Sequence, residues 1–386
     1  MLKRIWRASL APIFAAASAI IISAIALWIS GNDPVEAFSE MWKTIDSTES
    51  VVLIINRAVP LYIAGVAVAI GFQMNLFNIG SNGQFILASL ITGWATAEVD
   101  LPPVLHVLFA ISLAMLVGGA WALIAGVLNV TRGVNVVVST IMLNFIAIGL
   151  ASFLLSEFFR DEERGGLVAQ TRPIPDSAQL PPLNAIFEFF GFNFGEGVEL
   201  LGFLPLAILL GIAYYVLLNR ARFGYNLRLS GQSADAALTA GVNPKRMVLI
   251  TLFMSGAVAG LIGLPLLLAD PSFHKYGDAF PSQLGFTGLG LALLGRNHPL
   301  GIGAAALVWA TIERATQRLG PIGIPPEIGR IMQGAFLLSA VIAYEVVKRR
   351  NDALAVAEAA RATAAPPPPP SPPPDSGAVQ PSGAPA

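Results

Sequence analysis

The sequence of 386 residues has no cysteine, three histidines and few charged residues. Without cysteine, the chain has no disulfide framework, no thiolate metal site and no cysteine nucleophile. His106, His274 and His298 are scattered along the chain, so we expect no catalytic residues and no metal site. A formal net charge of −1 gives no footprint for nucleic-acid binding. The chain also lacks any Gly-Lys pair, which excludes the phosphate-binding loop of an ATPase, and we expect no cofactor bound to it.

What the sequence does contain is apolar residues, which make up 55% of it, against 12% charged residues. That balance is far from the composition of a soluble domain and indicates an all-α polytopic membrane protein. A membrane-spanning helix needs ~20 mostly apolar residues. We expect about ten spans, near residues 8–29, 51–72, 83–97, 104–130, 134–158, 199–218, 247–269, 281–295, 300–316 and 328–347. A turn at Arg296, Asn297 and His298 divides the eighth from the ninth.

Basic residues set the expected orientation. Lys3, Arg4 and Arg7 precede the first span and a Lys-Arg-Arg run follows the last, so we expect both ends in the cytoplasm. A cleaved signal peptide is the alternative for residues 8–29, but its apolar core is usually only ~7 to 15 residues long. Segment 159–198 is long and acidic and is expected outside. Segment 219–246 carries five arginines and lysines against Asp235 alone and is expected inside.

The spans fall into two blocks, 51–158 and 247–347, which start on opposite sides of the membrane. Such inverted-topology halves place a pathway at their interface in many transporters. Each block has a glycine-interrupted stretch, 71–83 in the first and 285–303 in the second. An interrupted helix frees backbone groups that protein or a water-filled cavity must satisfy.

Uncharged polar residues gather in the first block. The candidates for lining a pathway are Asn75, Asn78, Asn82, Gln84, Thr140 and Asn144. Side-chain amides suit a neutral polar solute better than an ion. The alternative is that they hydrogen-bond between helices, and for Thr140 and Asn144 both interpretations stay open. Gly256 and Gly260, four residues apart, predict close helix packing.

Charged residues are rare within the spans. Arg57, Glu313 and Arg330 lie near predicted ends, where snorkelling lowers the cost of burial, and a structural or interfacial role is expected for them. No carboxylate lies at the centre of a clear span, which disfavours a proton-coupled or sodium-coupled pump.

Segment 219–246 contains a short helix with small side chains. Ser233 can cap a helix Ala234–Thr239, and Gly241 can end it in the left-handed conformation. Alanines at 234, 236, 237 and 240 leave a nearly flat surface for a protein partner. An ordinary amphipathic loop helix is the alternative.

Residues 351–386 are rich in alanine, proline and serine and include the run Pro366–Pro370. With no apolar periodicity, the segment is expected to be a disordered, extended tail. A ligand for a proline-recognition domain is the alternative.

Four stretches together resemble a known family. They are Pro60-Leu61 with Gly65, LFNIGSNGQFILAS at 76–89, VVVSTIMLNFIA at 136–147 and SGQSADAALTAGVNPKR at 230–246. The chain is similar there to the inner-membrane permeases of binding-protein-dependent ABC importers, in the branch that serves simple sugars, nucleosides and branched-chain amino acids. The resemblance covers most of residues 1–350.

The resemblance implies a ten-span type II importer fold in a bacterial plasma membrane. It implies a second permease subunit, expected to be a different homologous chain, cytoplasmic ATPases that use ATP and Mg²⁺, and an external solute-binding protein. The helix near Ser233 then looks like the coupling helix that contacts the ATPase. The residues expected at that contact are Gln232, Ser233, Ala236, Ala237 and Gly241.

The sequence departs from the family at Ser81-Asn82, where an acidic residue is frequent, and at Gln232-Ser233, where Glu-Asn is common. These departures leave the expected fold unchanged. From the resemblance we expect a permease for a nucleoside or a simple sugar. A branched-chain amino acid permease, an ion-coupled secondary transporter and a structural membrane scaffold remain the alternatives.

Overall fold

The computed structural model describes residues 17–161, 169–191, 194, 197–325 and 327–339, and the single positions 342, 346, 349, 353 and 356. Every regular element in this part of the chain is helical, apart from one isolated bridge between Gln170 and Gly277. Residues 8–16 of the first predicted span lie outside the described residues, and so does the predicted tail 351–386 except for positions 353 and 356.

A helix lies within the described part of each predicted span, although in the span 199–218 it begins only at Leu204 and in the span 281–295 at Leu284. The first is the helix Ala17–Ile29 and the last covers residues 327–339. Between them lie α2 (Pro34–Trp42), η1 (Lys43–Ile45), α3 (Thr48–Phe72), α4 (Ser81–Glu98), α5 (Pro103–Arg132), α6 (Val136–Glu157), η2 (Asp176–Ala178), α7 (Asn184–Phe189), α8 (Leu204–Tyr215), η3 (Val216–Arg220), α9 (Arg222–Gln232), α10 (Ala234–Thr239), α11 (Pro244–Gly260), η4 (Leu261–Gly263), α12 (Leu264–Ala269), α13 (Leu284–Leu294), α14 (Pro299–Gln317) and η5 (Gly320–Ile322).

Four of these helices are long and apolar enough to cross a membrane alone: α3, α5, α6 and the run Pro244–Ala269. A fifth results if α8 with η3 is joined to α9 across a bend of 67°. Ala17–Ile29 and α13 are apolar but shorter. The chain is therefore a multi-pass membrane protein built from both full-length and short apolar helices.

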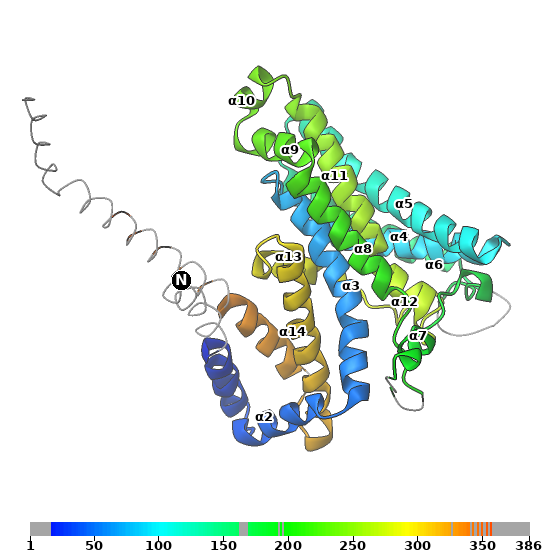
Figure 1. The fold of residues 1–386 in the computed structure, drawn as a ribbon, viewed down its shortest axis with the longest axis vertical. Helices are drawn as coiled ribbons and strands as arrows, with labels where there is room; N and C mark the ends of the chain where they lie inside the picture. The colour runs from blue at the N-terminus through cyan, green and yellow to red at the C-terminus, as the bar shows by residue number, and fades with distance from the viewer. Residues whose placement is uncertain are drawn as a thin grey trace, which may run out of the picture.

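Helix α3 is the centre of the bundle (Figure 1). Apart from the half-buried Tyr62, every residue from Ala58 to Gly71 is buried, and α11, α13 and α14 pack around it. Helices α5 and α6 lie further out and expose large apolar side chains such as Leu116 and Phe145, which suits contact with lipid.

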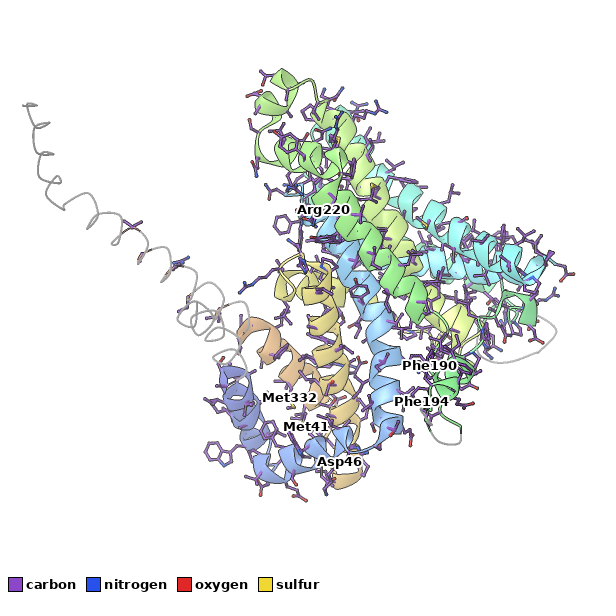
Figure 2. All side chains as sticks on the ribbon, viewed as in Figure 1. Met41, Asp46, Phe190, Phe194, Arg220 and Met332 are labelled. Carbon is purple, nitrogen blue, oxygen red and sulfur yellow. The ribbon has the colours of Figure 1, made fainter. Side chains whose placement is uncertain are left out.

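A second apolar cluster joins the two ends of the described chain. Leu27, α2 and the helix 327–339 meet there, and Met41 and Met332 contribute side chains from either side (Figure 2). This cluster packs beside the lower part of α14, through Ile312.

The two ends of the molecule differ. Helices α9 and α10 lie at one end, while α2, Asp46 and α7 lie toward the other (Figures 1 and 2). The predicted turn between α13 and α14 is confirmed, because Arg296 and Asn297 adopt left-handed conformations with φ of 53° and 55°.

Segment 219–246 contains a second helix besides the predicted one. Helix α9 precedes α10, and its buried residues Gly224, Leu227 and Ser230 recur at helical spacing. Ala221 is extended, which breaks the chain direction after η3, and Arg228 donates from Nη1 to the carbonyl of Leu218 at the break. The arginine thus satisfies a carbonyl that the end of a helix would leave unpaired.

Candidate functional site

The N-terminal ends of α4 and α13 meet inside the bundle. Ser81 Oγ, at the first position of α4, donates to the carbonyl of Gly285, 2.9 Å away, at the start of α13. A Cβ added at Gly285 would lie 2.5 Å from the backbone nitrogen of Asn82, so only glycine allows this approach. Each of the two interrupted stretches predicted from the sequence supplies one of these helices, and the fold brings them together.

Four of the predicted lining residues surround the start of α4. Asn78, Gln84, Thr140 and Asn144 are all buried, with exposures of 2% or less. Asn78 and Gln84 exchange two hydrogen bonds of 3.0 Å, and Asn78 Nδ2 also donates to Ser255 Oγ on α11 at 2.9 Å. These contacts tie the turn between α3 and α4 to α11.

Asn144 reaches this turn from α6. Its Oδ1 accepts from the backbone N–H of Gly83 at 2.7 Å, and its Nδ2 donates to the carbonyl of Ile79 at 2.8 Å. Gly83 is the third residue of α4, whose N–H has no partner within its own helix, so Asn144 caps α4 from a neighbouring helix. Thr140 Oγ1 bonds only to carbonyls of its own helix, those of Val136 and Val137.

Asn82 differs from its neighbours. It is 1% exposed, yet its Oδ1 accepts no hydrogen bond from the described residues. A buried acceptor without a donor is costly and indicates a partner other than the described residues. Of the six predicted lining residues, Asn82 is the one whose polar atom is unsatisfied at the junction of α4 and α13.

Asn75 lies apart from the other five. It adopts a left-handed conformation with φ of 56° and donates from Nδ2 to the carbonyl of Gly231 on α9, 2.9 Å away. A Cβ at Gly231 would lie 2.6 Å from the Met74 carbonyl carbon, so α9 rests directly on the turn after α3. Asn75 therefore joins the α9–α10 end to the same turn that holds Asn78.

Helix α10 is confirmed at the predicted residues, Ala234–Thr239. Ser233 Oγ accepts from the N–H of Ala236 at 3.2 Å, and Gly241 has φ of 76°. The N–H of Gly241 bonds to Leu238 O and that of Val242 to Ala237 O, at 3.0 and 2.9 Å. Both hydrogen bonds belong to the Schellman motif, which ends a helix at a left-handed glycine.

The expected flat surface of four alanines is wrong at one position. Ala237 is fully buried and faces the rest of the protein, whereas Ala236 and the flanking Gln232 and Ser233 are exposed. Leu238, which the sequence analysis did not select, is 59% exposed on α10. In the sequence, the feature that could have identified Leu238 was a large apolar side chain in a short, capped helix.

Metal chemistry has no support among the described residues, because no three His, Asp or Glu side chains there lie close enough to hold a metal ion.

Comparison with known proteins identifies the family of the chain. The family described as branched-chain amino acid transport system / permease component matches residues 50–341. The chain is 30% identical over 352 residues to the glucose ABC transporter permease protein TsgB13 of Haloferax volcanii, covering 89% of this chain and 90% of the relative. It is 28% identical over 342 residues to the guanosine ABC transporter permease protein NupP of Bacillus subtilis, covering 87% and 94%.

A third relative is the nucleoside ABC transporter permease protein NupB of Lactococcus lactis, 26% identical over 365 residues, or 92% of this chain and 97% of the relative. No solved structure matches the chain.

Proposed function

This chain belongs to the family of branched-chain amino acid transport system permease components, and we propose that it is the permease subunit of an ATP-driven importer for a nucleoside or a simple sugar. The names of its relatives support these two classes of solute. The observation that carries the proposal is α10, a capped helix with an exposed leucine that protrudes at one end of an apolar bundle (Figure 1).

The ten-span arrangement with inverted halves is part of the proposal. Helices α4 and α13 each follow the first long helix of their block, and their N-terminal ends meet at Ser81 and Gly285. Transporters with inverted repeats build central sites from interrupted helices in this way. On this arrangement both chain ends and α10 face the cytoplasm, α7 faces outward, and the membrane is the plasma membrane of a bacterium.

The partners follow from the same arrangement. Residues 219–246 form the coupling segment, and α10 contacts a separate cytoplasmic ATPase that binds ATP and Mg²⁺. This chain contributes no catalytic group. A second, homologous permease subunit completes the pathway, and an external binding protein delivers the solute to the end opposite α10.

Replacing Leu238 with aspartate tests the proposed ATPase contact. We expect ATPase co-purification to weaken by about 30-fold, because a central apolar anchor in an interface commonly contributes that much affinity. Affinity of the purified permease for the ATPase encoded beside it is the measurement. The control is Ile186→Asp on α7, since Ile186 is 57% exposed, close to the 59% of Leu238, but lies toward the opposite end.

If Leu238→Asp and Ile186→Asp bind the ATPase with equal affinity, α10 is not part of the contact with the ATPase. If no ATPase associates with the unaltered chain and uptake persists after ATP depletion, the importer proposal itself fails and an ion-coupled transporter replaces it.

We also propose that the junction of α4 and α13 borders the solute pathway, with the amide cluster holding its walls. Asn82→Leu is expected to leave the free energy of unfolding within ~1 kcal/mol, because an acceptor without a partner contributes no hydrogen bond. Solute uptake should fall by about tenfold if the free Oδ1 hydrogen-bonds to the passing solute. Unchanged uptake in proteoliposomes, at unchanged thermal stability, would place the pathway elsewhere.

A further inference from the structure

A polar cavity of about 500 Å³ lies between α3, α14, the start of α13 and the helix 327–339. Its volume falls within the range of small-molecule sites, ~300 to 1,000 Å³. Arg57 of α3 and Glu313 of α14 line it in the half of each helix nearer α2, the end opposite α10 (Figure 1). On the proposed orientation this is the half that faces outward.

The cavity borders the start of α13. Gln283 and Leu284 line it, and the next residue, Gly285, is the glycine that touches Asn82. The lining of the cavity is therefore next in sequence to the glycine at the junction of α4 and α13. Gly329 closes the wall beside α14, because a Cβ there would lie 2.7 Å from Thr316 Oγ1.

An ion pair neutralises the deepest charges of the wall. Arg57 donates from Nε to Glu313 Oε2 at 3.0 Å and from Nη2 to Oε1 at 2.6 Å. Because the pair is bidentate and both side chains are about 30% exposed or less, each charge is already matched within the protein. Arg330 also lines the cavity but is exposed to solvent. Arg57 and Glu313 cancel, and the one remaining charge among the lining residues, that of Arg330, is exposed to water, which screens it.

The remaining polar groups suit hydroxyls. The side chains of Gln283 and Gln333 line the cavity and make no hydrogen bond within the described part of the chain. A primary amide donates and accepts, which matches the two roles of each hydroxyl on a sugar ring. The Thr287 hydroxyl donates to the carbonyl of Gln283, so it is left as an acceptor.

Trp309 adds a flat apolar surface to the same wall. An indole beside a few convergent polar groups is the usual composition of a site for a small polar ligand. The larger cavity, about 800 Å³ between α3, α8 and α14, is lined mainly by aliphatic residues such as Ile55, Leu204 and Leu300. Its chemistry suits a lipid chain and not a hydrophilic solute.

We propose that the cavity between Arg57, Trp309 and Gln333 is an outward-facing site for a neutral polyhydroxylated solute, a sugar ring either free or as the ribose of a nucleoside. The inference rests on the proposed importer function. It identifies the sugar ring as the chemistry that the two proposed solute classes share, and it places the entry site for the solute.

The test is ligand-observed saturation-transfer NMR on the full chain in nanodiscs. The probes are D-glucose, D-ribose, guanosine, L-leucine and ribose 5-phosphate. We expect binding of at least one of the first three, with weaker or no binding of leucine and the phosphate. Glucose or ribose without guanosine would identify a free sugar, and guanosine alone would identify a nucleoside. Tighter binding of leucine or of ribose 5-phosphate, or no binding of any probe, would overturn the proposal.

Variants locate the site. Gln333→Leu and Trp309→Ala should each weaken binding by about tenfold, while Trp309→Phe, which keeps an aromatic ring, should stay within about threefold. The control is Gln179→Leu, whose amide bonds to Asp176 in the loop before α7. If Gln333→Leu does not fold, Gln283→Leu probes the opposite wall. Binding that none of the cavity variants weakens beyond the control would place the site elsewhere.

ATPase co-purification on the same samples separates the two proposals. If the chain binds none of the solutes but still binds the ATPase, the cavity proposal is wrong and the importer proposal stands. Solute binding that is sensitive to Gln333, in a chain that recruits no ATPase, would keep the cavity site and reject the importer.

Discussion

Replacing Gly256 with leucine is expected to destabilise the bundle by ~3 kcal/mol, the upper end of what overpacking usually costs. Gly256 lies where α11 crosses α5. A Cβ at this position would clash with the Cβ of Ala122 and with the carbonyl oxygen of Gly118, and a Cβ at Gly118 would in turn clash with Gly256 O. The obstacle is therefore backbone as well as side chain, and backbone cannot rotate away as a flexible side chain can.

Small residues matter more here than in a soluble protein. Lipid is as apolar as the helices, so helix association depends on close van der Waals packing and not on removal of apolar surface from water. Gly260 continues the same contact one turn later, against the carbonyl of Ala114. Separating α5 from α11 would remove the close approach along both turns.

The measurement is thermal unfolding of the purified chain in detergent, compared with Gly149→Leu. Gly149 lies on α6, and a Cβ there would meet nothing within 4 Å, so the control adds the same side chain to a glycine in a helix without a clash. We expect a clear fall in Tm for Gly256→Leu and little change for the control. Similar Tm values for the two variants would show that α5 and α11 can move apart with little loss of stability.

This helix contact was predictable because the pattern is local. Gly256 and Gly260 are four residues apart on one helix, which is enough to identify a close-packing face, although not the partner helix. The same holds for α10. Ser233 caps its start and Gly241 ends it through hydrogen bonds to residues nearby in the sequence, so both ends of the helix could be predicted.

What the sequence did not predict depends on contacts between distant segments. Helix α9 has a polar composition, and its burial depends on the turn after α3, which Gly231 approaches. Ala237 looks identical to Ala236 in the sequence, and only the direction in which α10 packs decides which of them is buried.

The cavity shows the same limit in the site itself. Arg57 and Glu313 were noticed as charges near the ends of spans, but 256 positions separate them, and the sequence analysis did not predict that they form a pair. Trp309 comes from the same helix as Glu313, and Gln283 and Gln333 come from two further segments. An arginine and a glutamate in two otherwise apolar helices was the available signal, because such charges in membrane helices usually pair.

Replacing Asn144 with leucine should distinguish how the buried amides act. The change removes the hydrogen bonds to Gly83 N and Ile79 O and leaves both buried groups unpaired. At 1 to 3 kcal/mol for each unsatisfied group, we expect a total cost of about 3 kcal/mol. The start of α4 would then lose its cap, and the junction with α13 would loosen with it.

Thr140→Val is the matched control, one turn away on the same helix and equally buried. Thr140 Oγ1 bonds only to carbonyls that its own helix already satisfies, so its loss should cost less than ~1 kcal/mol. Unfolding in detergent and solute uptake should be measured on both variants. Stability lost only in Asn144→Leu would establish that this amide holds the interrupted helix in place. If Asn144→Leu were as stable as Thr140→Val but transported poorly, Asn144 would instead act on the solute, and the interhelical hydrogen bonds would be secondary.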